Sequence, residues 1–135
     1  MTEEATPTGL PKIVVVVVED DHYILDFLKF TLEQQGYDVY PAADGQEGLN
    51  LIERKLPVLV VLDLMLPKLD GFSILKKMSE KAETAKIPVV VVSAYTASES
   101  TRRMVQTQKN VREVFTKPIR SKEFVAKLKE IVSIR

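Results

Sequence analysis

The stretch VVLDLMLPKLDG, residues 60–71, decides the fold, because an apolar run ends inside it on a carboxylate, Asp63. The run itself, VLVVL at 58–62, has no polar alternation, which is typical of a strand buried on both faces of a parallel sheet. The following Pro67 and Asp70 favour a loop and a turn. Asp63 therefore lies at the exit of a buried strand, where an acid either caps the strand end or is presented for chemistry.

Two further runs predict buried strands of the same kind, KIVVVVV at 12–18 and PVVVV at 88–92. Both are continuous and rich in β-branched residues. Two weaker candidates, YDVYPA at 37–42 and EVFT at 113–116, contain more polar residues, and we expect them nearer the edges of the sheet. The sequence therefore predicts five strands.

Helix-like segments separate these strands. The segment HYILDFLKFTLEQQG at 22–36 ends on Gly36, a residue common after helix C-termini. We expect its apolar side chains to be core or partly covered: Ile24, Leu25, Phe27, Leu28, Phe30 and Leu32. Capping residues predict the other helix starts, namely Asp44 with Glu47 for a helix through Lys55, Asp70 for 71–82, Thr96 with Glu99 as a capping box for 100–108, and Ser121 for the last helix.

The alternation of strands and helices predicts the α/β class, as a flavodoxin-like (βα)5 doubly wound sandwich with right-handed crossovers. Its five-stranded parallel sheet would have the order 2-1-3-4-5. We assign residues 11–135 to this domain and interpret the polar residues 1–10 as a disordered lead-in. Such sheets bind ligands beyond the carboxyl ends of their strands, where the winding reverses.

Composition excludes several classes of protein. The chain has no cysteine, so disulfides and cysteine-based metal sites are excluded. No apolar run approaches the roughly 20 residues that span a bilayer. The polar start is unlike a secretory or mitochondrial signal, so we expect a cytoplasmic protein. Basic residues concentrate after residue 100, but Lys+Arg and Asp+Glu balance at 19 each over the whole chain. We therefore interpret the basic region as a solvated face that does not bind nucleic acid.

Polar side chains follow the expected strands directly: Glu19, Asp20 and Asp21 after the first, Asp63 after the third, Ser93 after the fourth, and Lys117 with Pro118 after the fifth. In the expected order the first and third strands are neighbours, so Asp63 should lie near Glu19 and Asp20. Carboxylates this close repel one another unless cations join them. Lys117 supplies one positive charge, and all-oxygen ligands favour Mg²⁺ or Mn²⁺ for the remainder.

This group of residues has a chemical meaning. A carboxylate can attack phosphorus and form an aspartyl-phosphate. Phosphoryl transfer then needs mainly positioning and neutralisation of the phosphoryl oxygens, which a divalent cation, Lys117 and the Ser93 hydroxyl would provide. The sequence therefore favours Asp63 as a reactive group over Asp63 as a simple strand-end residue.

With these motifs the sequence resembles the receiver domain of two-component response regulators, in the chemotaxis-regulator-like superfamily, from about Pro11 to the C-terminus. The matching motifs are VVEDD after the first strand, GYDVYPAADGQEGL, LDLMLPKLDG around Asp63, VVVVSA with Ser93 and TKP with Lys117. Each motif is weak alone. In this order, and at one edge of a sheet, they are highly specific together.

The resemblance implies a role for each matching residue. Asp63 would accept a phosphoryl group from the phosphohistidine of a sensor histidine kinase or phosphotransfer protein, or from a small donor such as acetyl phosphate. Glu19, Asp20, Asp63 and the backbone carbonyl of Met65 would hold Mg²⁺, Ser93 would hydrogen-bond the phosphoryl group, Lys117 would pair with it, and Pro118 would follow a cis peptide bond.

The resemblance also implies a mode of action. Phosphorylation would remodel the face formed by the fourth helix, fifth strand and fifth helix, where a downstream protein would bind or a phosphorylation-linked dimer would form. The domain would catalyse its own phosphorylation and slow dephosphorylation without turning over a metabolite, so it would not be a turnover enzyme. We expect either a stand-alone protein or the front of a longer regulator.

Several positions depart from the family pattern. Glu19 stands where Asp is more common, and its extra methylene favours a water-bridged contact with the metal. Val114 replaces the aromatic residue that usually swings inward on activation, and Phe115 should point to the other side of its strand. Met65 and Tyr95 are bulky, which would shield an acyl phosphate from water.

Other classes fit less well. A haloacid-dehalogenase-type phosphatase needs a second acid two residues after its nucleophile, where this chain has Met65. A flavodoxin-type FMN protein needs a hydroxyl- and glycine-rich loop after the first strand, whereas EDDHYI at 19–24 would repel phosphate. His22, within that stretch, we interpret as a solvated surface residue. A pseudo-receiver, a protein-binding module that is not phosphorylated, stays open because the segment 95–115 departs most from the pattern.

Overall fold

The structure, a computed structural model, describes residues 12–133 except the side chains at 95 and 97, so the predicted lead-in at 1–10 lies outside the described residues. The strands are β1 (Val14–Val18), β2 (Asp38–Ala42), β3 (Leu59–Leu62), β4 (Val89–Ser93) and β5 (Val111–Thr116). The helices are α1 (His22–Gln34), α2 (Gly45–Lys55), α3 (Gly71–Ser79), α4 (Ala82–Ala85), α5 (Glu99–Gln106) and α6 (Ser121–Ser133), with a 3₁₀ turn, η1, at Ala94–Ala97.

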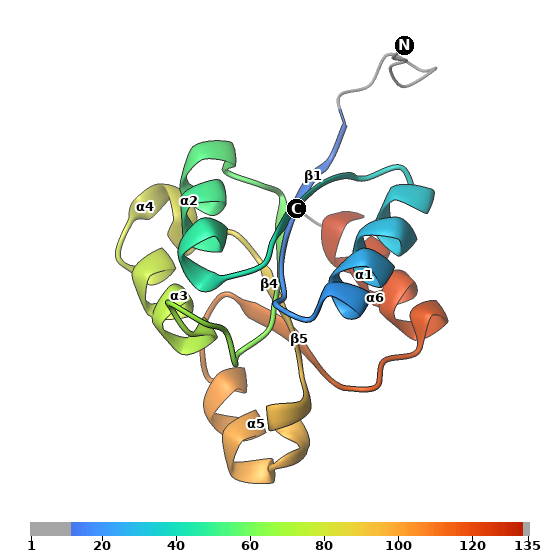
Figure 1. Ribbon diagram of the computed structural model, residues 1–135. Helices are drawn as coiled ribbons and strands as arrows, with labels where there is room; N and C mark the ends of the chain where they lie inside the picture. Colours follow the sequence, from blue (N-terminus) through green and yellow to red (C-terminus); the bar gives the residue numbers. More distant parts are fainter. Residues whose placement is uncertain (1–11, 134–135) are drawn as a thin grey trace.

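All five strands are parallel and lie in the order β2-β1-β3-β4-β5, which confirms the predicted topology. The two weaker strand candidates are indeed the edge strands, β2 and β5. Helices α1 and α6 lie side by side on one face of the sheet, and α2, α3 and α5 cover the other (Figure 1). Within residues 12–133, no helix has both the length and the apolar character needed to cross a bilayer.

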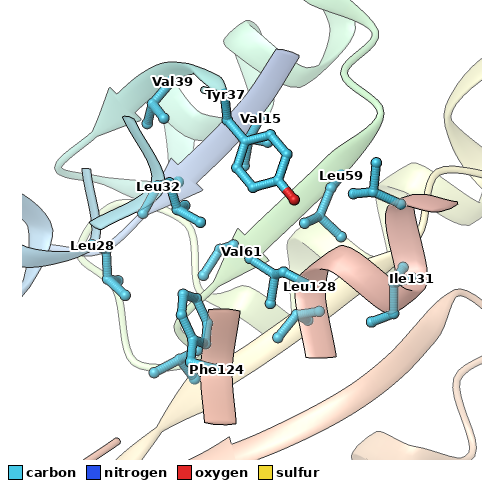
Figure 2. Close-up of a cluster of buried hydrophobic side chains, with 14 of the residues drawn as sticks. Val15, Leu28, Leu32, Tyr37, Val39, Leu59, Val61, Phe124, Leu128 and Ile131 are labelled. Atoms are coloured by element: carbon cyan, nitrogen blue, oxygen red, sulfur yellow. The ribbon is translucent and has the colours of Figure 1, made fainter. Parts of the chain in front are cut away.

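The core consists of two layers, one on each face of the sheet, and β1 shows why its sequence is an unbroken run of valine. Val15 and Val17 pack against α1 and α6, whereas Val16 and Val18 pack against the helices of the opposite face. All four side chains are fully buried, because successive residues of a strand point to opposite faces. Figure 2 shows the first layer, in which Phe124 and other apolar side chains meet the strands.

The predicted caps Asp44 and Asp70 are present, and Asp21 caps α1 in the same way. Asp21, Asp44 and Asp70 accept hydrogen bonds from backbone N–H groups at the starts of α1, α2 and α3. These bonds satisfy N–H groups that have no partner within the helix. Gly36, two residues after α1, has φ +91°, a conformation that glycine adopts without a steric penalty.

Three local predictions were wrong. The helix expected over 71–82 ends at Ser79, and a separate short helix, α4, follows it. Thr96 does not cap α5, whose N-cap is Ser98. Thr96 is instead fully buried in η1, and its hydroxyl donates to the carbonyl of Ser93. Phe27 and Phe30, expected to be core or partly covered, are 42% and 63% exposed. The reason is that Leu25, Leu28 and Leu32 fill the α1 face that meets the sheet.

Candidate functional site

A cleft of about 550 Å³ lies beyond the carboxyl ends of β1, β3 and β4. Its lining contains every predicted site residue: Glu19, Asp20, Asp63, Met65, Ser93 and Lys117, together with Asp21, Ile24 and Ala94. Asp21 caps α1, because its Oδ1 accepts hydrogen bonds from the N–H groups of Tyr23 and Ile24, and this oxygen is therefore not free to bind a ligand in the cleft. The parallel topology therefore brings the predicted residues together, as the sequence indicated.

Asp63 follows β3 directly and is fixed by the ends of the neighbouring strands. Its own N–H donates to the carbonyl of Val18 at 3.0 Å. Its Oδ1 accepts from the N–H of Leu64 at 2.7 Å, and its Oδ2 lies 3.2 Å from Nζ of Lys117. The side chain is buried but faces the cleft, so the carboxylate is held in one orientation toward any ligand there.

The ammonium of Lys117 bridges two acids, with Nζ 2.8 Å from Glu19 Oε1 and 3.2 Å from Asp63 Oδ2. Burial lowers the pKa of Lys117, but the close ion pair with Glu19 and the charge of Asp63 outweigh burial, and the net pKa is raised. Lys117 therefore stays protonated. The peptide bond between Lys117 and Pro118 is cis, as expected.

Glu19 is 1% exposed, and only one of its two carboxylate oxygens accepts a hydrogen bond. Its Oε2 accepts from the N–H of Asp21 at 3.0 Å. Its Oε1 approaches Lys117 as an ion pair, but without the geometry of a hydrogen bond, so this buried oxygen has no hydrogen-bond donor. Burial raises the pKa of Glu19, and Lys117 and the N–H of Asp21 oppose that rise.

The acidic residues fit a divalent cation. Carboxylate oxygens of Glu19, Asp20 and Asp63 lie within 4.8 Å of one another. Three carboxylates face one ammonium, and an oxygen of Glu19 lacks a donor, so the site has capacity for more positive charge. A set of oxygen ligands suits Mg²⁺ rather than Zn²⁺.

Sequence reasoning missed three residues that adjoin the site: Thr96, Arg102 and Thr116. Thr116 pairs with Ser93 in the β4–β5 register, and its hydroxyl lies 2.9 Å from that of Thr96. Arg102, on α5, reaches both threonines. The pairing of strand ends in the predicted sheet was the signal that could have placed Thr116 beside Ser93.

The structure places Val114 and Phe115 on opposite faces of β5, which confirms the predicted alternation. Val114 packs against the layer that contains Val105 of α5. Phe115 packs against the other layer, with its ring centroid 5.4 Å from that of Phe124. Phe115 therefore cannot replace the missing aromatic residue at position 114. The side chain of Tyr95, predicted to shield the site, lies outside the described residues.

A doubly wound sheet with three acids, a serine and a lysine at one edge defines a class of α/β signalling domain. The family model described as the response regulator receiver domain matches residues 15–129. The chain therefore belongs to the receiver domains of two-component response regulators, and the resemblance inferred from its motifs is confirmed.

One curated relative is the alkaline phosphatase synthesis transcriptional regulatory protein PhoP of Bacillus subtilis (strain 168). The two are 34% identical over 118 residues, which cover 87% of this chain and 48% of PhoP. The chain thus spans about half the length of this relative.

Solved structures of receiver domains share the fold. The Francisella response regulator 1452 receiver domain is 30% identical, with a TM-score of 0.80 over 90% of this chain and 98% of that one. The non-phosphorylated HemR receiver domain from Leptospira biflexa is 31% identical, with a TM-score of 0.78 over 90% and 95%. The receiver domain of the sensor histidine kinase PA1611 from Pseudomonas aeruginosa PAO1, with a magnesium ion in its active-site cleft, matches in fold at 21% identity, with a TM-score of 0.81 over 91% and 99%.

Proposed function

We propose that this domain accepts a phosphoryl group on Asp63 in a Mg²⁺-dependent reaction and thereby changes its affinity for a partner protein. The observation that carries the proposal is the position of Asp63, held at the floor of the cleft beside Glu19 and Lys117. The nucleophile and the charges that would stabilise a phosphoryl group are already in place before any donor arrives.

In the proposed reaction the Asp63 carboxylate attacks phosphorus, and a new O–P bond forms. The P–N bond of phosphohistidine, or the P–O bond of acetyl phosphate, breaks, and its electron pair leaves with the imidazole or the acetate. Lys117 and Ser93 would contact the transferred oxygens. Bound Mg²⁺ would neutralise charge on those oxygens, with Glu19, Asp20, Asp63 and the Met65 carbonyl as its protein ligands.

A protein donor is supported by an apolar surface beside the cleft. Tyr23, Phe27 and Phe30 of α1 are 88%, 42% and 63% exposed and are spaced four and three residues apart, so they share one side of the helix. Exposed aromatic side chains in a group are typical of protein–protein contacts. We therefore propose a sensor histidine kinase or a phosphotransfer protein as the donor.

The downstream protein would bind the face made by α5, β5 and α6. These are the fourth helix, fifth strand and fifth helix of the predicted order, because α3 and the short α4 together occupy the segment predicted as the third helix. Met104 on this face is 51% exposed, and Arg112 is exposed as well. A phosphorylation-linked dimer would use the same face. The domain would act in the cytoplasm and turn over no metabolite, and we propose no direct contact with nucleic acid.

The test is the intact mass of the protein after incubation with acetyl phosphate and Mg²⁺. We expect the gain of one phosphoryl group, absent in Asp63→Asn and in the presence of a chelator. Asp70→Asn is the matched control, since Asp70 lies in the same loop but caps α3. A protein that neither gains mass nor binds Mg²⁺ would be a pseudo-receiver, and the proposal would be wrong.

A further inference from the structure

A chain of polar contacts connects α5 to the phosphoryl-binding edge of the sheet. The Thr96 hydroxyl lies 2.8 Å from the carbonyl oxygen of Ser93 and 2.9 Å from the Thr116 hydroxyl. Nη2 of Arg102 lies 3.3 Å from the Thr116 hydroxyl oxygen, and Nε of Arg102 lies 3.3 Å from the Thr96 carbonyl oxygen. Thr96 and Ser93 are buried and have little access to water, whereas Arg102 and its contact with Thr116 are exposed at the surface.

The direction of every bond in this chain is fixed by counting protons. Arginine can only donate, and each threonine hydroxyl has one proton to give. Since the Thr96 hydroxyl donates to the Ser93 carbonyl, the Thr116 hydroxyl must donate to Thr96 and accept from Arg102. The bonds therefore run in one direction, Arg102 to Thr116 to Thr96 to Ser93, and such chains strengthen their members cooperatively.

This series of hydrogen bonds ends at Ser93, where the candidate site begins. Ser93 carries the hydroxyl proposed to contact the phosphoryl group, and Thr116 immediately precedes Lys117. The Ser93 carbonyl also accepts from the N–H of Lys117 at 3.3 Å. Because a peptide unit is planar, holding this carbonyl also fixes the N–H of Ala94, a residue that lines the cleft.

We propose that Thr96 is a positioning residue for the phosphorylation of Asp63, and that Arg102 and Thr116 couple the position of α5 to it. This inference rests on the proposed function. This series of hydrogen bonds would connect the site to α5 in a domain where Val114 replaces the aromatic residue that usually swings inward on activation. Movement of α5 would break the Arg102 contact and loosen the end of β4, and a change at Ser93 would reach α5 by the same bonds.

Two measurements test the proposal, and the first needs no phosphoryl transfer. Amide hydrogen exchange of Lys117, whose N–H donates to the Ser93 carbonyl, is compared in the wild type, Thr96→Val, Thr96→Ser and Arg102→Gln. Val removes the hydroxyl with little change of shape, and Ser retains it. We expect exchange about fivefold faster in Thr96→Val, as expected for one hydrogen bond of about 1 kcal/mol, a smaller rise in Arg102→Gln, and most of the protection restored in Thr96→Ser.

The second measurement is the rate of Asp63 labelling at saturating acetyl phosphate and Mg²⁺. We expect Thr96→Val to lower the limiting rate constant roughly five- to tenfold while the half-saturating donor concentration changes little. Arg103→Gln is the control, because Arg103 is the next residue on α5 and, among residues 12–133, forms its ion pair with Glu99 on the same helix.

Each outcome decides something. Exchange in Thr96→Val equal to that of the wild type, or labelling at the wild-type rate, overturns the inference. An equal effect of Arg103→Gln and Arg102→Gln overturns the coupling to α5. If the wild-type protein is never labelled, the proposed phosphorylation of Asp63 is wrong instead. The exchange experiment then still tests whether Thr96 fixes the end of β4.

Discussion

Nζ of Lys117 lies 2.8 Å from Glu19 Oε1 and 3.2 Å from Asp63 Oδ2, so one ammonium group compensates two buried carboxylates from different strands. Without that ammonium, the two buried acids at the ends of β1 and β3 would repel each other at the edge of the cleft. A divalent cation at the same carboxylates would share this role. The lysine is therefore part of the stability of the domain as well as of its proposed chemistry.

Replacing Lys117 with Met should destabilise the protein in the presence of a chelator. We expect a loss of roughly 1–3 kcal/mol, less than the 3–5 kcal/mol of a fully buried ion pair because the cleft is open to water. Urea unfolding measures this loss. Mg²⁺ should restore more stability to Lys117→Met than it adds to the wild type, since the cation no longer competes with the ammonium.

Lys129→Met is the control for this variant, because Lys129 is exposed on α6 and should change stability by no more than about 0.5 kcal/mol. If Lys117→Met is as stable as the wild type without metal, the ammonium does not hold the two acids together.

Asp20 and Asp21 are neighbours that should affect Mg²⁺ affinity differently. Asp20 contributes to the carboxylate cluster, whereas the Asp21 side chain is engaged by backbone N–H groups of α1. We expect Asp20→Asn to weaken Mg²⁺ binding at least about tenfold, a loss of about 1.4 kcal/mol. Asp21→Asn should have a much smaller effect, because Asn caps a helix as well as Asp. Isothermal titration calorimetry measures both, and equal losses would contradict this ligand set.

The fold could be predicted from the sequence because its strongest signals are long and unambiguous. Unbroken valine runs such as Val14–Val18 are short and β-branched, which favours a strand covered on both faces, and helix-like segments separate them. Parallel strands then place their carboxyl ends at one edge whatever the details of packing. Glu19, Asp63 and Lys117 could be brought together on that argument alone.

The predictions that were wrong concern residues whose local pattern competes with a distant contact. Thr96 and Glu99 have the spacing of a capping box, but the Ser93 carbonyl lies within reach of the Thr96 hydroxyl, and the chain forms η1 first. Phe30 shares an apolar side with Phe27, yet the sheet meets only the leucine side of α1. Local spacing does not reveal which of two apolar sides a sheet will cover.

Gly71 holds the loop after Asp63 in place. A Cβ at this position would lie 2.5 Å from the Asp63 carbonyl oxygen and 2.7 Å from Cα of Leu64, both backbone atoms that cannot yield without moving Asp63. Gly71→Ala should therefore lose roughly 1–3 kcal/mol of stability, as overpacked sites do, and should be labelled more slowly by acetyl phosphate while still folded.

The matched variant is Gly36→Ala. No atom lies within 4 Å of a Cβ there, but φ of +91° strains any side chain, so stability should fall by about 1–2 kcal/mol. Labelling of Asp63 should not change, because Gly36 is remote from the cleft. Slower labelling in both variants would show that lost stability, not displacement of Asp63, is the cause.

The Asp70 cap should give the protein part of its sensitivity to acid. The N–H of Ser73 donates to Asp70 Oδ1 at 3.0 Å, and this bond lowers the pKa of Asp70 below its ordinary value of 3.8 although slight burial opposes it. Because the folded state holds the proton less tightly than the unfolded state, the stabilisation is complete above that value and is lost as the pH falls through the folded pKa.

Asp70→Asn retains the cap but cannot titrate. Between about pH 5 and about pH 3, the wild type should lose roughly 0.5 kcal/mol more stability than this variant, the usual size of a charge at an exposed helix start. Urea unfolding across this range measures the difference, and Asp44, whose pKa is also lowered, contributes equally to both proteins. Parallel pH profiles would mean that the Asp70 charge adds nothing to the cap.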